Sequence, residues 1–164
     1  MKFVFLGVGL SFVSGATAQV VLNEVCVSNL NGLTVTNPID GSAEQEDWVE
    51  LFNTTGAAVN IAGWYLSDDP VLPNKWAFPA GASVPANGRL VVLCSAWNGF
   101  FGGYYSTNFK LNQTSADQVI LSDGSATPVD SYQLNLRTMV DQSRGRVPDG
   151  SGSWSLIATP TPGA

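Results

Sequence analysis

The stretch "DWVELFNTTGAAVNIAGWYLSDD", residues 47–69, decides the fold class of this chain. In its first part, the apolar residues Val49 and Leu51 alternate with residues that face the other way, which is the period-two pattern of a β-strand. Residues 58–68 repeat a strand pattern that is interrupted by Gly63. We therefore expect one half-buried strand followed by two short strands with a bend between them.

The same pattern extends along the rest of the chain. Short apolar runs alternate with turn signals such as "PANGR" and "SDGSATP", and no stretch sustains the apolar spacing of an amphipathic helix. Strands are expected at residues 20–28, 47–53, 58–68, 75–79, 89–95, 108–111, 118–123, 129–134, 143–148 and 154–158. Around nine such strands without intervening helices predict an all-β protein, an antiparallel β-sandwich in a single domain.

The N-terminal residues have the features of a secretory signal peptide. A positive charge at Lys2 precedes a short apolar run at residues 3–13, and Ala16-Thr17-Ala18 fits the small-x-small cleavage pattern. We interpret residues 1–18 as this signal and residues 19–164 as the mature domain; the alternative is a buried N-terminal strand. The protein is then expected to be secreted or held at the cell surface, without membrane insertion after signal cleavage.

Composition excludes several classes of function. The chain has 13 acidic and 7 basic residues and a net charge of −6, with no basic cluster, so nucleic-acid binding is not expected. It has no histidine, which removes the usual Ser-His and Cys-His nucleophile systems and histidine-based zinc sites. We therefore expect a protein that is not an enzyme.

Two cysteines, Cys26 and Cys94, lie in separate apolar runs. In an oxidising compartment they are able to form a disulfide, which is the interpretation we favour. The alternative is a pair of free buried thiols.

Four segments, in order, resemble the signature of lamin-tail domains. They are "DWVELFNTTGAAVNIAGWYLSDD" (47–69), "KWAFPAGASVPANGRLVVLCS" (75–95), "TNFKLNQTSADQVILSDGSATPVDSY" (107–132) and "SRGRVPDGSGSWSLIATPTPGA" (143–164). The resemblance covers nearly all of the mature chain. It implies an immunoglobulin-like β-sandwich of the exported bacterial type, and it carries over no catalytic residues.

Acidic residues form the first candidate site. Asp40, Asp47, Asp68 and Asp69 fall close together in the sequence, and clustered oxygen ligands are what calcium requires. Calcium is therefore the single cofactor to consider. The alternative for the Asp68–Asp69 pair is a polar turn at the end of a strand, where Asp side chains accept backbone hydrogen bonds.

Glu50 raises a separate question, because it lies on a strand whose other face is apolar. We expect a partly buried acid that is satisfied by backbone groups or by Arg144 or Arg146.

The second candidate site is the Gly-rich segment "AWNGFFGGYYSTN", residues 96–108, which is crowded with aromatic side chains. Exposed aromatic rings on a rigid sandwich are suited to contact a sugar or a protein. The alternative is that the rings fold back over one end of the sandwich. The candidate ligand-binding residues are Trp97, Phe100, Phe101, Tyr104 and Tyr105.

These observations predict a secreted, non-catalytic lamin-tail-type domain that acts as an extracellular interaction or adhesion module. Its expected partner is an extracellular protein or a glycan. A carbohydrate-binding module that uses residues 97–105 and a calcium-dependent surface module remain the alternatives.

Overall fold

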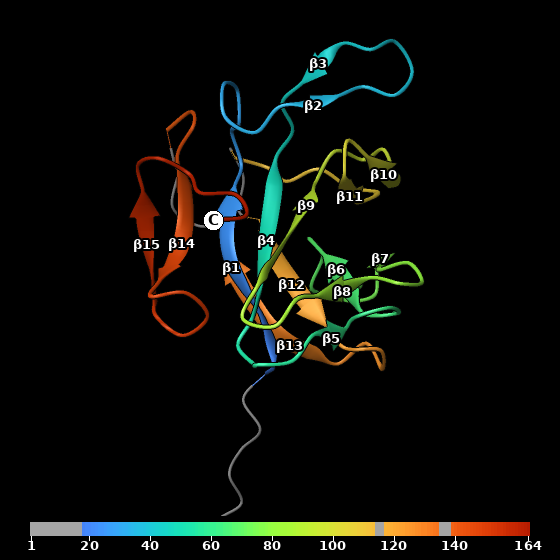
Figure 1. Ribbon diagram of the computed structural model, residues 1–164, viewed down its shortest axis with the longest axis vertical. Helices are drawn as coiled ribbons and strands as arrows, with labels where there is room; N and C mark the ends of the chain where they lie inside the picture. The colour runs from blue at the N-terminus through green and yellow to red at the C-terminus, as the bar shows by residue number, and fades with distance from the viewer. Residues whose placement is uncertain (1–17, 114–116, 135–138) are drawn as a thin grey trace, which may run out of the picture.

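A computed structural model describes residues 18–113, 117–134 and 139–164, and these residues form strands and turns without a helix. Two large sheets face each other, with the larger one in front in Figure 1. The seven-stranded sheet has the order β10 (Gly99–Phe101), β11 (Tyr104–Ser106), β9 (Arg89–Leu93), β4 (Trp48–Asn53), β1 (Val20–Cys26), β14 (Ser143–Val147) and β15 (Ser153–Ile157). The four-stranded sheet has the order β13 (Pro128–Gln133), β12 (Gln118–Ser122), β6 (Tyr65–Ser67) and β7 (Trp76–Ala77).

Two small ribbons complete the fold. One is the hairpin of β2 (Val35–Thr36) and β3 (Ala43–Glu44), which projects from one end of the molecule in Figure 1. The other pairs β5 (Val59–Asn60) with β8 (Ser83–Val84). The chain is thus the expected all-β, immunoglobulin-like sandwich, with fifteen short strands in its described residues where about nine were expected.

The main core lies between the two large sheets. Val49 and Leu51 of β4 face inward and join Leu66, Val119 and Leu121 of the smaller sheet in one buried cluster. This confirms the alternation expected for residues 47–53, because every second residue of a strand faces the same side. Burying these side chains supplies the main favourable free energy of the fold.

The outer face of the large sheet is also buried. Cys26, Trp48 and Leu93 point away from the main core and form a second cluster, which is covered by Leu33 and Val35 from the segment before and within β2. The central strand β1 is therefore buried along its whole length. A strand buried on both faces carries a near-continuous apolar run rather than a clean alternation, and "VVLNEVC" follows this pattern except at Asn23 and Glu24.

A bulge in β1 places two polar residues on this outer face. The register between β1 and β4 shifts between Leu22 and Glu24, so Asn23 and Glu24 both follow the inward-facing Leu22 on the outer side. Glu24 then lies directly opposite Glu50. Two carboxylates in one cross-strand pair repel each other unless donors neutralise them.

The C-terminal segment, residues 158–164, supplies several of those donors. Thr161 donates from its backbone N and from Oγ1 to Glu24, at 3.1 and 2.8 Å, and the N–H of Gly163 donates to Glu50 Oε2 at 2.7 Å. Figure 1 shows this segment, which ends at the label C, crossing in front of β1. The segment is thus a cover over the paired carboxylates.

The environment of Glu50 confirms the expected backbone donor but not the expected arginines. Its partners are Asn23 Nδ2 at 2.8 Å, the Gly163 N–H and Arg89, whose Nε lies 3.6 Å from Oε1. The expected arginine partners were wrong: Arg146 binds Asp130 instead, and Arg144 lies on the other face of its strand. Burial raises the pKa of Glu50 above its ordinary value, although its hydrogen bonds to Asn23 and Gly163 oppose that rise.

Most expected strand positions are confirmed, with informative differences. The expected bend in residues 58–68 lies at Gly63, whose φ of 79° is in the left-handed region, and it separates β5 from β6. Residues 108–111 form one isolated bridge instead of a strand. The pairing of β11 with β9 is parallel, which departs from the expected antiparallel sandwich.

The C-terminal segment 158–164 contains two threonines that each precede a proline, and the hydroxyl of Thr161 donates to Glu24. Replacing each threonine by alanine is therefore expected to change the stability of the domain by different amounts. Thr161→Ala removes the hydroxyl that binds Glu24 and is expected to lower the free energy of unfolding by about 1.5–3 kcal/mol, the value of a hydrogen bond to a charged group. Thr159→Ala is the matched control, because Thr159 is exposed like Thr161 but its hydroxyl forms no hydrogen bond among the described residues. Urea unfolding of both variants measures the difference. Equal losses in the two variants would contradict the proposed role of the cover.

Candidate functional site

The aromatic segment forms a β-hairpin rather than an irregular loop. Strands β10 and β11 pair with Phe100 opposite Tyr105 and Phe101 opposite Tyr104. Gly102 and Gly103 form the turn with positive φ values of 57° and 91°. Because β11 pairs with β9, the hairpin extends the large sheet and is held on its edge.

The five aromatic residues do not form one exposed surface. Tyr105 packs against the main core and contacts Phe78 edge-to-face at 6.4 Å, while Tyr104 packs against the second cluster. Phe100 is 61% exposed, whereas Trp97 and Phe101 are half-buried. The expected site is therefore corrected: β11 provides anchoring rings, and β10 with Trp97 provides the accessible ones.

Two hollows flank the hairpin. A pocket of about 290 Å³ is lined by Trp76, Ala77, Pro79, Asn98, Gly99 and Phe100. Trp76 Nε1 donates to Asn98 Oδ1 at 3.1 Å, which fixes the amide at this pocket. A second pocket of about 180 Å³ lies between the hairpin and the β2–β3 loop and is lined by Asn37, Pro38, Ile39, Trp97 and Phe101.

Sequence reasoning missed the contribution of the β2–β3 loop. Ile39 is 92% exposed at the tip of that hairpin, beside the pocket that contains Trp97 and Phe101. Val35 of β2 also lies against the β10–β11 turn, 3.2 Å from a Cβ placed on Gly102. The isoleucine in the turn sequence "TNPIDG" could have indicated this exposed apolar contact, because apolar residues are uncommon among turn residues.

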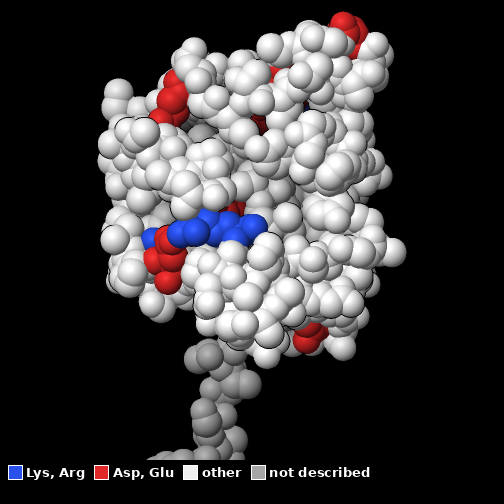
Figure 2. All heavy atoms as spheres, viewed as in Figure 1, with Lys and Arg blue, Asp and Glu red and all other residues white. Residues whose placement is uncertain are grey.

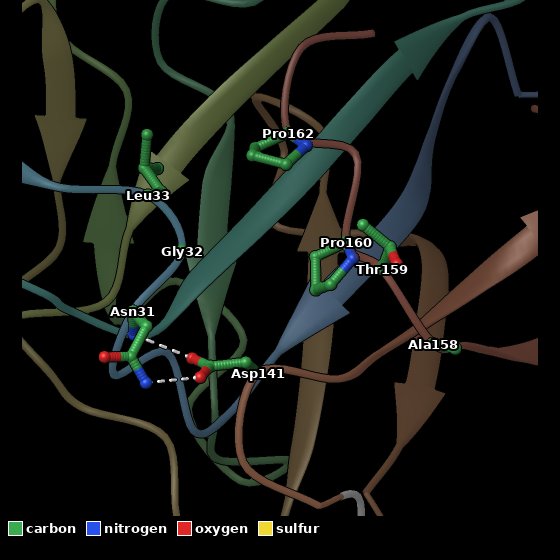
Figure 3. A pocket seen from close by; sticks show the side chains of 8 residues that line it. All are labelled: Asn31, Gly32, Leu33, Asp141, Ala158, Thr159, Pro160 and Pro162. Atoms are coloured by element: carbon green, nitrogen blue, oxygen red, sulfur yellow. Dashed lines mark hydrogen bonds between the residues drawn. The ribbon is translucent and has the colours of Figure 1, made fainter.

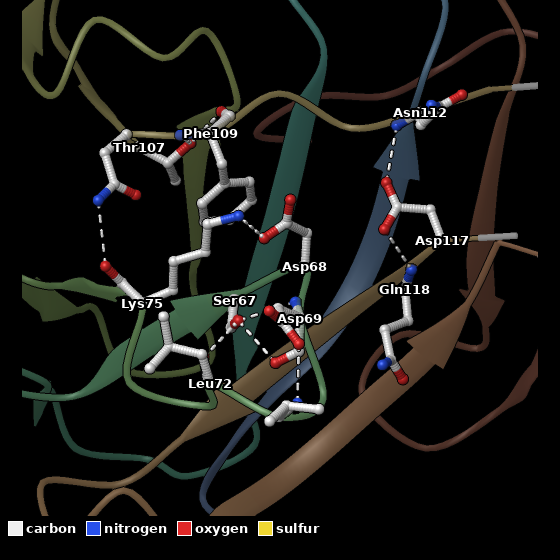
Figure 4. Close-up of polar contacts among 12 residues, drawn as sticks. Ser67, Asp68, Asp69, Leu72, Lys75, Thr107, Phe109, Asn112, Asp117 and Gln118 are labelled. Atoms are coloured by element: carbon white, nitrogen blue, oxygen red, sulfur yellow. Dashed lines mark hydrogen bonds and ion pairs between the residues drawn. The ribbon is translucent and has the colours of Figure 1, made fainter. Parts of the chain in front are cut away.

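The four carboxylates proposed for calcium do not come together. Asp68 accepts from Lys75 Nζ at 2.6 Å, and Asp69 Oδ1 accepts from the N–H of Val71 (Figure 4). Ser67 Oγ also binds the turn, accepting from the N–H of Asp69 and donating to the carbonyl of Leu72. The pair thus forms the polar turn at a strand exit, which was the alternative interpretation.

The other two carboxylates lie elsewhere. Asp40 binds the N–H and hydroxyl of Ser42 at the exposed tip of the β2–β3 hairpin, and these bonds hold its pKa below the ordinary value. Asp47 is partly buried at the start of β4, where Glu46 pairs with Lys110 at 2.9 Å. Within the described ranges, no three acidic or cysteine side chains lie close enough to share a metal ion. The expected calcium ligand set is therefore wrong.

Asp47 is nevertheless electrostatically unusual. Burial, with a smaller contribution from the adjacent Glu46, raises its pKa from 3.8 to about 7, and Lys110 opposes the rise. The carboxyl shows no hydrogen bond from the described residues. Its main-chain carbonyl, in contrast, accepts the N–H of Cys94. Asp47 is therefore a partly buried acid whose charged form is disfavoured.

The expected disulfide is not formed. Cys26 and Cys94 are free and buried. Cys26 belongs to the cluster on the outer face of the large sheet, whereas Cys94 follows the outward-facing Leu93 and joins the main core. The two thiols therefore point to opposite faces, a geometry in which a disulfide cannot close. Burial raises the pKa of Cys26 to about 11, which disfavours the reactive thiolate.

A further pocket, of about 480 Å³, lies where the two covers of the outer face meet (Figure 3). Asn31, Gly32 and Leu33 line one side, and Pro160 and Pro162 line the other. Asp141 ties the wall together by accepting from the N–H groups of Leu30 and Asn31 and from Asn31 Nδ2. These bonds lower the pKa of Asp141 below its ordinary value. The walls of the pocket are mainly apolar.

Charged side chains are sparse on the face of the molecule that Figure 2 shows. Figure 2 shows one short band of basic side chains with carboxylates against it, while other carboxylates are scattered. Arg89 pairs with Asp149, and its guanidinium lies 5.3 Å from the Phe52 ring centre. Such a paired and stacked arginine has a structural role and offers no strong field to a charged ligand.

The architecture defines an immunoglobulin-like β-sandwich with an aromatic hairpin at one sheet edge. Residues 14–135 match the family model described as Lamin Tail Domain. The match covers most of the chain, so the protein belongs to the lamin tail domain family, and the resemblance noted in the sequence is confirmed. No curated protein and no solved structure matched the chain.

Family membership gives a coarse functional assignment. Lamin tail domains are non-catalytic immunoglobulin-like domains, and the family indicates a role in protein interaction. Within the described part of the chain, no helix has the length and apolar character needed to cross a bilayer. The expected signal peptide lies outside the described residues, apart from Ala18.

The separated carboxylates predict that calcium does not stabilise the domain. Adding about 5 mM calcium is expected to leave the melting temperature unchanged, because only an ion bound to the native state raises it. Differential scanning fluorimetry with and without a chelator is the measurement. A rise of several degrees would show that a calcium site exists after all.

Asp47 predicts a pH dependence of stability. The unfolded chain releases this proton near pH 3.8 and the folded chain near pH 7, so Asp47 makes the free energy of unfolding fall as pH rises between these values. Asp47→Asn cannot ionise, and it is expected to flatten this fall and to be relatively more stable at pH 8. Chemical unfolding from pH 4 to 8 measures both proteins. Parallel profiles for the variant and the parent would refute the assignment.

Proposed function

We propose that this protein is a secreted or cell-surface, non-catalytic interaction module that binds its partner through β10, Trp97 and the β2–β3 loop. The observation that carries the proposal is the accessible ring of Phe100 on a rigid sheet edge, which lines one pocket, while Trp97 and Phe101 of the same segment line a second one. The apolar run at residues 3–13 followed by Ala-Thr-Ala supports export.

The construction of the hairpin supports a division between anchoring and contact residues. Phe100 packs edge-to-face on Tyr105 at 5.2 Å, and Tyr105 is fixed by the main core. Trp97 packs similarly on Phe101 at 5.2 Å. Rings that are held in place lose little conformational entropy on binding, which favours them as contact residues.

The favoured partner is a protein. Ile39, Pro38 and Phe100 add aliphatic and aromatic area that is not matched by nearby charge, and such surfaces form the centres of protein interfaces. The family's association with protein interaction supports the same choice.

A glycan is the second candidate, and one observation favours it. The pocket beside Phe100 combines an aromatic ring with the amide of Asn98, whose oxygen is already occupied by Trp76. Its Nδ2 group points to no partner among the described residues and is available to donate to a sugar hydroxyl. A glycan array with the intact domain distinguishes this candidate from a protein partner.

Site-specific photo-crosslinking tests the favoured proposal. A benzophenone side chain at position 100 is expected to capture a discrete partner from the cell envelope of the source organism, and the same group at the exposed Met139 serves as the matched control. Equal capture at both positions, or none at position 100, would refute the proposal.

A companion variant separates binding from folding. Phe100→Ala is expected to weaken binding of the captured partner by roughly 30-fold, as for an interface hot spot. Because Phe100 is mostly exposed, its replacement is expected to change the free energy of unfolding by less than about 1 kcal/mol. A large loss of stability would instead show that the ring belongs to the core.

A further inference from the structure

The edge of the large sheet opposite the aromatic hairpin carries a second unusual feature. Strand β15 pairs only with β14 among the described residues, so the outer row of its backbone groups is free. In Figure 1 both strands lie at the far left, beyond the labelled strands of the smaller sheet. A free edge of this kind is a template for an added strand.

Arg144 on β14 is the unusual charge at this edge. Its Nε is buried without a hydrogen-bond partner, and no carboxylate of the described residues forms an ion pair with it. The neighbouring arginine on the same face, Arg146, is by contrast fully used, since it binds Asp130 through NH2 and the carbonyl of Leu22 through Nε. A buried guanidinium atom without a hydrogen-bond partner is costly, and a carboxylate brought to this edge would supply an acceptor. The charge of Arg144 also acts on the nearby Tyr132, where it opposes the rise in the pKa of the phenol that burial causes.

Side chains beside Arg144 supply a contact surface. Leu156 lies directly opposite Arg144 on β15 and is 47% exposed, and Trp154 lies opposite Arg146. Trp154 is held by Tyr132 of β13, with ring centres 3.8 Å apart in a stacked arrangement. The edge therefore combines apolar contact area, a fixed aromatic ring and an uncompensated positive charge.

We propose that β15 and Arg144 form a docking site for an extended acidic peptide segment of another protein, which adds to the large sheet as an eighth strand. Backbone hydrogen bonds to β15 supply affinity, and a glutamate of the peptide on the inner face neutralises Arg144. The added strand lies two strand spacings from β14, about 9.6 Å, a gap that an arginine and a glutamate side chain span together.

The positive charge of Arg144 and the free backbone groups of β15 indicate the class of partner. The segment 153–157 contains no acidic residue, so pairing with β15 of a second copy leaves Arg144 without a carboxylate. An acidic peptide satisfies both the free backbone edge and the charge. This site is on the opposite edge from the aromatic hairpin and does not depend on the function proposed for it.

The probe is a synthetic seven-residue peptide with alternating valine and glutamate, blocked at both ends. Titrated into the labelled intact domain, it is expected to shift the amide resonances of β15 first and to leave those of β10 unchanged. The same peptide with glutamine in place of glutamate is expected to bind at least about tenfold more weakly, because the charge-assisted bond is lost. Equal binding of the two peptides, or no shift at β15, would overturn the proposal.

Variants separate a binding role of Arg144 from a structural one. Arg144→Gln is expected to reduce affinity for the glutamate peptide at least about tenfold, and Arg144→Lys to restore part of it. Neither variant is expected to lower the melting temperature, because the side chain of Arg144 forms no hydrogen bond or ion pair among the described residues and its buried Nε is unsatisfied. Phe100→Ala is the control on the other edge and should bind the peptide normally. Unchanged affinity in Arg144→Gln, or self-association through β15 instead of peptide binding, would refute the site.

Discussion

The structure depends on the burial of β1 and β4 on both faces. The inner face packs against the smaller sheet, and the outer face is covered in two places, by Leu33 and Val35 and by the C-terminal segment 158–164. Because the outer face is buried, the carboxylates of Glu24 and Glu50 need hydrogen-bond donors from the protein itself. Glu24 and Glu50 lie opposite each other and are almost fully buried. Ser143 and Thr161 donate to Glu24, and Asn23 and Gly163 donate to Glu50. Together with Arg89 beside Glu50, these contacts offset the burial of the two carboxylates.

The same constraint locates the surfaces that are free to bind. The centre of the large sheet is occupied on both sides, which leaves its two edges, β10 and β15, for partners. At the first edge the rings of β11 are anchored in the two cores while Phe100 remains exposed. At the second, Arg144 remains without a carboxylate. The two proposed binding surfaces therefore lie apart from the residues that carry the core, as is common for rigid scaffolds that place binding residues at their periphery.

Features that follow from local pattern could be predicted from the sequence. The alternation at residues 47–53, the bend at Gly63 and the hairpin at residues 122–128 all appear as expected, because side-chain period and turn chemistry are local. The bulge at Asn23 and the C-terminal cover of the outer face could not be predicted, since they depend on contacts between residues more than a hundred positions apart. The disulfide and the calcium set failed for the same reason: proximity in sequence, or a shared compartment, does not fix the face on which a side chain lies.

Native-state hydrogen exchange tests the central claim that the doubly buried β1–β4 pair carries the stability of the domain. The account predicts that the amides of β1 and β4 exchange only through global unfolding. The amides of β10 and β11 should exchange through smaller, local openings, because that hairpin lies at an edge. Protection of the hairpin equal to that of β4, or local opening of β1 while the rest of the sheet stays protected, would contradict it.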